Sequence, residues 1–289
     1  MKHIGPVVAD REGLRVIDCK ECGWCHLEVL PDSDDVLMRY YTCLYYKKED
    51  GCFDKERMEH SRNLWDTAYS YQMELLGNSP LIIDWGAGAG WFLQWLIDTK
   101  KPCECIGIEP SDVARSYLKD IGYNRPPWIV KNYNHMPLLM PANHRASLVF
   151  EHILDPVSML NQMKVRLYRK ILIIVPNEMN IAQRYFQRDN AWWVSKLHLN
   201  YWTPQGLRNL ARKANMKVVY ETSTFPMEFF LAFSHFGKDY RTDDNWGKKC
   251  HEFRLHFEKR VGRIAFDLYH LLYSKWKIGR ELMFVLESI

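Results

Sequence analysis

Three glycines that alternate with other residues, directly after a short apolar segment, constrain the fold more than any other feature of the sequence. Residues 81–84 have the composition of a buried strand, and Gly86, Gly88 and Gly90 follow before a helical pattern that begins at Trp91. Glycine lets the backbone turn sharply and approach a ligand, because no Cβ intervenes. The N–H groups at a helix start favour an anionic group. The segment therefore predicts a strand–loop–helix unit that binds a nucleotide-type cofactor.

An acidic residue at the end of the next predicted strand supports this interpretation. Glu109 ends residues 104–109 and lies about 20 residues beyond the loop, where a carboxylate accepts hydrogen bonds from ribose hydroxyls. A dinucleotide site needs a small residue in the first turn of the helix, and Trp91 follows Gly90 instead. A dinucleotide enzyme and a glycine-rich turn without a ligand are therefore weaker alternatives.

Strand-like and helical segments alternate from residue 81 to the end of the chain. Residues 170–175 are almost continuously apolar, as expected of a strand that is buried on both faces. Alternating strands and helices predict a mostly parallel sheet with ligands at the carboxyl ends of its strands. The predicted strands cover residues 81–84, 104–109, 128–132, 146–150, 170–175, 217–220 and 282–286. Helices are predicted to begin after Ser33 and after Thr203, both of which are typical N-cap residues, and one helix is predicted over residues 246–273.

Several later segments extend the pattern beyond the loop. Residues 150–156 (FEHILDP), 175–178 (VPNE) and 192–203, with its WW pair and HLNYWT, resemble segments of class I S-adenosylmethionine-dependent methyltransferases of the type 11/12 group. The resemblance implies an α/β Rossmann-like fold: a seven-stranded, mostly parallel sheet with an antiparallel last strand, helices on both faces and a small N-terminal β-rich and helical cap. Residues 225–230, 250–251 and 278–281 resemble a narrower bacterial subgroup.

The resemblance also implies an activity, a cofactor and a set of site residues. It implies methyl transfer from S-adenosylmethionine to a small polar acceptor, such as a sugar or a specialised metabolite. The residues implied for the cofactor are Asp84, Gly86, Gly88, Gly90, Glu109, Asn132, Tyr133 and Phe150, with Asn132 or Tyr133 beside the adenine. The residues implied for the acceptor are Glu151, Asn177, Trp193, Asn200 and Tyr201.

Two histidines are candidate catalytic bases. A hydroxyl or amine acceptor must lose a proton, and histidine titrates near neutral pH. His152 follows the fourth predicted strand, and His198 lies in an aromatic segment just before Thr203, where we expect the chain to close over the site. A structural histidine, bonded to Glu151 or to a carbonyl, is the alternative for His152. The sequence leaves the choice between the two histidines open.

Composition and charge limit the remaining alternatives. The net charge is only +4, and the basic residues between 248 and 263 are interspersed with acidic ones. We therefore expect a small-molecule substrate rather than nucleic acid, although a nucleic-acid methyltransferase and a non-catalytic scaffold remain alternatives. The chain has no apolar run of about 20 residues, and its first residues lack a secretory pattern, so we expect a cytoplasmic protein without a membrane span. The sequence does not predict the oligomeric state.

The first 55 residues differ from the rest and hold five of the eight cysteines. Cys19 and Cys22 have the spacing of half a zinc knuckle, but residues 1–18 contain no cysteine. A complete site would need Cys25, His26, Cys43 or Cys52, and none of these repeats the paired spacing. We therefore predict a degenerate knuckle without metal in residues 1–55. Residues 56–289 then form the methyltransferase domain, with an aromatic and basic helical insertion at about 225–274.

Overall fold

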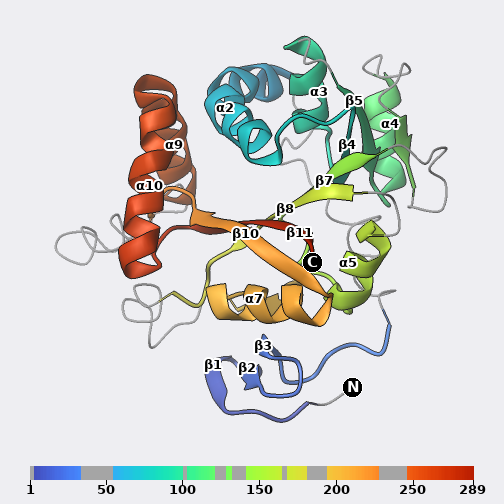
Figure 1. The fold of residues 1–289 in the computed structure, drawn as a ribbon. Coiled ribbons are helices and arrows are strands. Elements are labelled where there is room, and N and C mark those ends of the chain that lie inside the picture. Colours follow the sequence, from blue (N-terminus) through green and yellow to red (C-terminus); the bar gives the residue numbers. More distant parts are fainter. Residues whose placement is uncertain are drawn as a thin grey trace.

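Seven strands form one central sheet in the order β10-β11-β8-β7-β4-β5-β6 (Figure 1). The computed structural model describes residues 3–33, 55–99, 103–120, 128–131, 141–164, 168–180, 194–227 and 246–289. Neighbouring strands from β6 to β8 are parallel, whereas β11 is antiparallel to both β8 and β10. This arrangement confirms the predicted Rossmann-like fold. The strands are β4 (Leu81–Trp85), β5 (Glu104–Ile108), β6 (Trp128–Val130), β7 (Ala142–Ser147), β8 (Tyr168–Pro176), β10 (Met216–Ser223) and β11 (Glu281–Ser288).

Helices cover both faces of this sheet, as predicted. Figure 1 shows α2 and α3 above the sheet and α5 and α7 below it. The N-cap predicted at Thr203 is confirmed, because its side chain accepts a hydrogen bond from the Gly206 N–H at 2.9 Å. The helices are α2 (Lys55–Leu76), α3 (Trp91–Asp98), α4 (Asp112–Asp120), α5 (Pro156–Lys164), α7 (Pro204–Lys213), α9 (Trp246–Val261) and α10 (Arg263–Trp276).

Strand β8 lies inside the sheet, between β11 and β7, and separates two hydrophobic cores. Ile171, Ile173 and Val175 pack into the core under α5 and α7. Leu172 and Ile174 point the other way, into the core beneath α2, α3 and α10. Because side chains alternate along a strand, a strand buried on both faces must be apolar at every position. The prediction for residues 170–175 is therefore confirmed.

The predicted fourth strand, residues 146–150, was wrong in its bounds. Strand β7 covers Ala142–Ser147, and its first half carries polar side chains that conceal the strand pattern. These side chains are buried and bonded within the protein. The Asn143 amide donates to the Leu76 carbonyl at 2.8 Å, and His144 accepts a hydrogen bond from the Trp85 indole at 2.9 Å. Buried polar groups with partners are tolerated in a core strand, but hydrophobic patterning does not reveal them.

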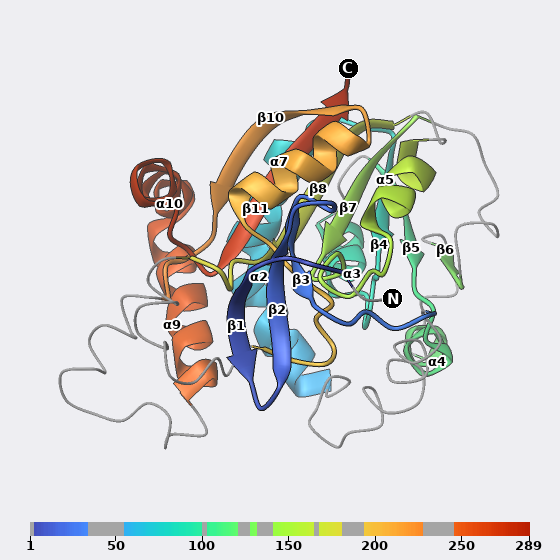
Figure 2. The ribbon, with the colours of Figure 1, turned by 90° about the horizontal axis from the view of Figure 1, so that it is seen from below.

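A second, small sheet is formed by β1 (Val7–Arg11), β2 (Leu14–Cys19), β3 (Trp24–Leu27) and β9 (Asn200–Tyr201). It lies under α7, away from the central sheet, as the two ribbon views show (Figures 1 and 2). Trp24 packs against Trp202, and the Asn209 amide of α7 donates to the Gly23 carbonyl at 2.6 Å. The predicted β-rich N-terminal segment is thus joined to the main body by a strand from residues 200–201.

The described residues 246–274 of the predicted insertion form two helices where the sequence predicted one continuous helix. Gly262 has a φ of 67° and separates α9 from α10, which no apolar periodicity could indicate. Among the described residues, no helix combines the length and apolar character that a membrane span requires. The helix predicted after Ser33 and the predicted site residues Asn132, Tyr133 and Trp193 lie outside the described residues, as do Cys43 and Cys52.

A buried ion-pair network fixes α9 against the edge of the central sheet. The Arg254 guanidinium is 3% exposed and donates to Glu258 at 2.8 Å and to Glu281, the first residue of β11, at 3.0 Å. Burial raises the pKa of Glu258 despite the neighbouring cation. Burial would also raise the pKa of Glu281, but the charge of Arg254 outweighs it and lowers that pKa.

Substitution Arg254→Met should lower the free energy of unfolding by about 3–5 kcal/mol, because it leaves two buried carboxylates without their cation. The matched control is Arg263→Met on α10, whose ion pairs with Glu74 and Asp267 are exposed and whose loss should cost only about 0–1 kcal/mol. Urea denaturation followed by circular dichroism measures both values. Equal losses in the two variants would contradict the assigned role of Arg254.

Candidate active site

The glycine loop follows β4 and adopts a conformation that other residues rarely reach. Gly86, Gly88 and Gly90 have φ values of 69°, 55° and 72°. A Cβ on Gly86 would lie 2.5 Å from a methyl group of Val149, and a Cβ on Gly90 would lie 2.7 Å from a methyl group of Leu118. Both distances are shorter than atomic contact permits. The loop therefore combines positive φ with close approach, and it leaves its backbone open to a ligand.

Glu109 is bonded to this loop from the end of β5. Its Oε2 accepts the Gly88 N–H at 2.8 Å, and its Oε1 accepts the Ser111 N–H at 2.8 Å. The side chain is only 3% exposed, and burial raises its pKa while the two N–H donors oppose that rise. Each carboxylate oxygen retains a second lone pair, which a ribose hydroxyl can use. The geometry fits the predicted ribose acceptor.

Asp84 forms a buried ion pair beneath the loop. Its Oδ1 lies 2.7 Å from Nη1 of Arg145, and the Arg145 Nε donates to Gln72 at 2.8 Å. Arg145 lies in β7, and its guanidinium pairs with the Asp84 carboxylate near the end of β4. The cation also stacks over the Phe92 ring, 4.3 Å from its centroid. A role of Asp84 in organising the glycine loop stays a prediction.

An acid–histidine cluster lies at the same edge of the sheet. The His198 Nδ1 is 3.1 Å from a carboxylate oxygen of Glu178, which follows β8. His152, which follows β7, has its ring centroid 4.9 Å from that of His198 and its Nε2 3.8 Å from Glu151. The potential ligand atoms of Glu151, His152 and His198 lie within 4.8 Å of one another. The cluster can bind a proton, a polar acceptor or a cation.

Val149 connects the cluster to the glycine loop. Its side chain lies against Gly86, and its carbonyl accepts the His152 N–H at 2.9 Å. The Glu151 carbonyl in turn accepts the N–H groups of Leu199 and Asn200 at 2.7 and 3.0 Å. Short backbone links therefore run from the cofactor loop to the segment that carries His198.

A family model for methyltransferase domains matches residues 58–221, more than half of the chain. The chain belongs to the methyltransferase domain family. This membership confirms the predicted S-adenosylmethionine-dependent methyltransferase and the predicted cofactor. No curated protein sequence matches the chain significantly.

Solved methyltransferases share the fold at low sequence identity. The plantazolicin methyltransferase BamL, in complex with a triazolic desmethylPZN analog and SAH, is 14% identical, with a TM-score of 0.52 over 88% of this chain and 95% of that chain. The plantazolicin methyltransferase BpumL, in complex with SAH, is also 14% identical, with a TM-score of 0.51 over 89% and 95%. A SAM-dependent methyltransferase from Archaeoglobus fulgidus is 16% identical, with a TM-score of 0.49 over 81% and 97%.

The two histidines of this methyltransferase differ in basicity. Burial opposes a charge on His198, but the hydrogen bond and charge of Glu178 outweigh it and raise the pKa of that imidazole. Burial lowers the pKa of His152 to about 4, although the hydrogen bond to the Leu197 carbonyl opposes this. His152 is thus neutral at physiological pH, with its Nδ1–H fixed on a carbonyl, whereas His198 is the more basic imidazole.

Glu178 is the site residue that the sequence analysis missed. It is 3% exposed, and as a carboxylate it accepts the Nδ1–H of His198, which leaves the His198 Nε2 available to a substrate. The available signal was an acidic residue directly after the VPN segment, at the carboxyl end of a central strand. Nothing local in the sequence paired it with a histidine 20 residues further on.

Several residues that were predicted to contact the cofactor or the acceptor have side chains that are buried within the protein. The Asn177 amide donates to the Lys277 and Gly279 carbonyls, and the Asn200 amide donates to the Phe150 and Ile153 carbonyls. The Tyr201 hydroxyl is bonded to the Ser195 backbone, and Phe150 is fully buried in the core. These residues support the shape of the site, and their contact with cofactor or acceptor stays a prediction.

Glu151 should make the stability of the methyltransferase depend on pH. Burial raises the pKa of this carboxyl from 4.5 to about 8. The folded state therefore holds the Glu151 proton more tightly than the unfolded chain does. The stabilising contribution of the protonated Glu151 to the free energy of unfolding is fully present below the ordinary pKa of glutamate, and it is lost as pH rises through about 8.

We expect the free energy of unfolding of the wild type, relative to Glu151→Gln, to fall between about pH 5 and about pH 8, because over this range the carboxyl is ionised in the unfolded chain while burial keeps it protonated in the folded protein. Denaturation at a series of pH values measures the difference. The matched control is Glu104→Gln, at an exposed position, which should give a curve parallel to the wild type. Parallel curves for wild type and Glu151→Gln would show that Glu151 does not titrate in this range.

Proposed function

We propose that the protein transfers the methyl group of S-adenosylmethionine to a hydroxyl or amine of a small polar acceptor, with His198 as the general base. The observation that carries this proposal is the His198–Glu178 hydrogen bond at the carboxyl edge of the sheet, joined through Val149 to the glycine loop. A scaffold that only retained the fold would not need an acid–base pair beside its cofactor loop.

The cofactor residues have separate tasks. The glycine loop approaches the cofactor through its backbone, and Glu109 accepts hydrogen bonds from the ribose hydroxyls. Asp84 and Arg145 hold the start of the loop from below. When bound, S-adenosylmethionine supplies a methyl group that is already activated by a positively charged sulfur. The protein therefore has to align an acceptor in line with the methyl–sulfur bond and exclude water.

His198 removes the acceptor proton. Glu178 would hold the Nδ1–H, so that the Nε2 lone pair could take the proton of the acceptor oxygen or nitrogen as that atom bonds to the methyl carbon, and the methyl–sulfur bonding electrons would return to the donor sulfur. The Glu178 carboxylate then stabilises the imidazolium. Glu151, protonated at neutral pH because of its burial, can donate a hydrogen bond to the acceptor.

The acceptor class rests on the polar character of this cluster. Glu151, Glu178, His152 and His198 offer hydrogen bonds to a hydroxyl or amine rather than an apolar surface. The BamL structure contains a triazolic desmethylPZN analog, so a methyltransferase of similar fold accommodates an organic acceptor of that kind. We propose a sugar or a specialised metabolite as the acceptor.

Substitution Glu109→Gln should weaken S-adenosylmethionine binding about tenfold or more, because a charged hydrogen-bond acceptor contributes about 1.5–3 kcal/mol. Titration calorimetry with S-adenosylmethionine and with its demethylated product measures the affinity. The control Glu104→Gln lies at the exposed start of the same strand and should bind as the wild type. Failure of the wild type to bind either compound would contradict the proposed function.

Substitution His198→Gln should lower kcat about 10²–10⁴-fold without changing cofactor affinity, because a general base acts only in the chemical step. Glu178→Gln should lower the pKa of His198 and shift the acidic limb of the pH–rate profile to lower pH. The assay follows transfer of a labelled methyl group to a panel of hydroxyl- and amine-bearing sugars and metabolites.

Two controls distinguish the alternatives. His256→Gln, at an exposed position of α9, should leave kcat unchanged. A larger loss in His152→Gln than in His198→Gln would assign the base to His152 instead. Transfer to nucleic acid alone, with steep salt dependence, would favour a nucleic-acid methyltransferase.

A further inference from the structure

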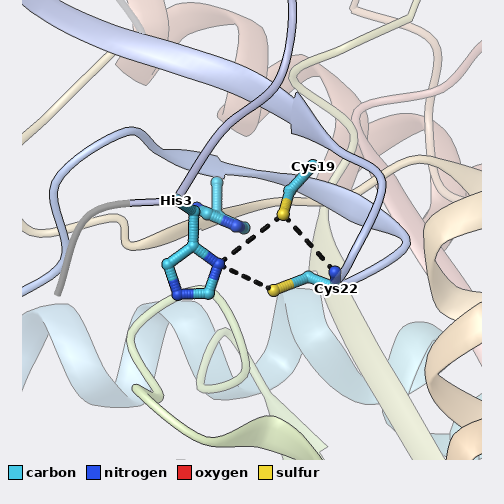
Figure 3. Close-up of side chains that lie close together, drawn as sticks. His3, Cys19 and Cys22 are labelled. Carbon is cyan, nitrogen blue, oxygen red and sulfur yellow. Dashed lines mark hydrogen bonds between the residues drawn. The ribbon is translucent and has the colours of Figure 1, made fainter.

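Two histidines and two cysteines converge in the small N-terminal sheet. The Nδ1 of His3 lies 3.3 Å from the sulfur of Cys22 and 3.6 Å from the sulfur of Cys19 (Figure 3). His26 packs edge-on against the His3 ring, with centroids 4.7 Å apart. One potential ligand atom from each of the four residues lies within 4.8 Å of the other three.

The backbone of the sheet brings these side chains together. Cys19 ends β2, Cys22 lies in the turn that follows, and His26 lies in β3 opposite Ile17. The Cys22 N–H points at the Cys19 sulfur at 3.4 Å, so the turn holds both cysteines on the same side of the sheet end. His3 is bonded through its backbone N–H to the Glu28 carbonyl at 3.2 Å. Sequence spacing alone could not place His3 beside the turn.

His26 is the side chain that most strongly indicates a ligand. It is 0% exposed, and its Nδ1 lies 2.6 Å from the Leu27 carbonyl, so the Nδ1–H donates to that oxygen. Its Nε2 is buried and has no hydrogen-bond partner within the described part of the chain. A buried nitrogen lone pair without a partner is costly. An imidazole that donates one N–H to a carbonyl and offers its other nitrogen is oriented as metal-binding histidines usually are.

The two distances from the His3 nitrogen to the cysteine sulfurs fit a tetrahedral zinc ion. Zn–S bonds of about 2.3 Å and Zn–N bonds of about 2.0–2.1 Å place sulfur and nitrogen ligands about 3.6 Å apart. The two sulfur–nitrogen distances of 3.3 and 3.6 Å match this value. Hydrogen bonding alone explains the cluster less well, because both sulfurs approach the same nitrogen of His3.

We propose that His3, Cys19, Cys22 and His26 bind one zinc ion. Two thiolates and two imidazoles are a common ligand set for structural zinc, and four protein ligands leave no open position for catalysis. This proposal replaces the sequence prediction of a degenerate knuckle without metal, which named His26 as a possible ligand but did not include His3.

The zinc ion would stabilise the part of the sheet that adjoins the active site. His26 pairs with Asn200 of β9, and the Trp24 indole donates to the Asn200 side chain at 2.9 Å. The Leu27 N–H donates to the Leu199 carbonyl at 2.9 Å, one residue from His198. The ion would therefore link β2 to β3, and β3 is hydrogen-bonded to the segment that contains the proposed base, His198.

The test measures zinc in the full-length protein purified under reducing conditions without added chelator. We expect about one zinc ion per chain by elemental mass spectrometry, and removal by a strong chelator should lower Tm. Replacement by Co²⁺ should give the visible absorption of a tetrahedral site and the charge-transfer band of cobalt–thiolate bonds. His3→Ala and Cys22→Ser should each lose stoichiometric metal and the effect of chelator on Tm.

Two cysteine variants outside the proposed ligand set serve as controls for the zinc measurement. Cys25→Ala changes a residue of the same hairpin whose side chain packs in the small core with Val16 and Leu27. Cys103→Ser changes a residue that packs against the core of the central sheet. Both should retain one zinc ion. Substoichiometric zinc in the wild type after incubation with Zn²⁺ would overturn the proposal, and so would a Cys22→Ser variant that binds zinc as the wild type does. Cofactor binding at the glycine loop is measured separately, so either proposal can fail alone.

Discussion

The contact between Gly86 and Val149 is the constraint on which the arrangement of the site depends. A single methyl group fills the space where a side chain at residue 86 would lie. The loop after β4 is therefore pressed against the loop after β7, and the latter leads within three residues to His152. Because both loops follow parallel strands, they meet at the same edge of the sheet. Cofactor loop and acid–base cluster are thus brought together by backbone packing rather than by a single polar contact.

Burial gives chemically similar groups different properties at this edge. Glu151 and Glu178 are both nearly inaccessible to solvent, yet burial raises the pKa of Glu151 to about 8, whereas Glu178 lies 3.1 Å from the His198 imidazole. His152 and His198 are neighbours, but only His198 has a carboxylate partner that raises its pKa. Environment therefore separates a proton donor from a proton acceptor among groups with similar reference values.

The parts of the fold that the sequence could predict have local causes. The glycine loop, the buried strand β8 and the Thr203 cap each follow from residues that are adjacent in sequence. Strand β7 was misplaced because Asn143, His144 and Arg145 are satisfied by partners far away in the sequence. Glu178 and His3 were missed for the same reason, since their partners lie on other elements. The places of β7, Glu178 and His3 depend on polar interactions between residues far apart in the sequence, and hydrophobic periodicity does not predict such interactions.

The same long-range pairing bears on the division into a cap of residues 1–55 and a domain of residues 56–289. Strand β9 comes from residues 200–201, yet it completes the small sheet by pairing with β3. Backbone hydrogen bonds therefore cross the proposed boundary next to His198. A ligand that binds only the folded cap stabilises every element whose folding is coupled to it. Metal bound by β2 and β3 would then favour the ordered form of residues 199–202, so the N-terminal segment would act as a structural support of the active site rather than as an independent domain.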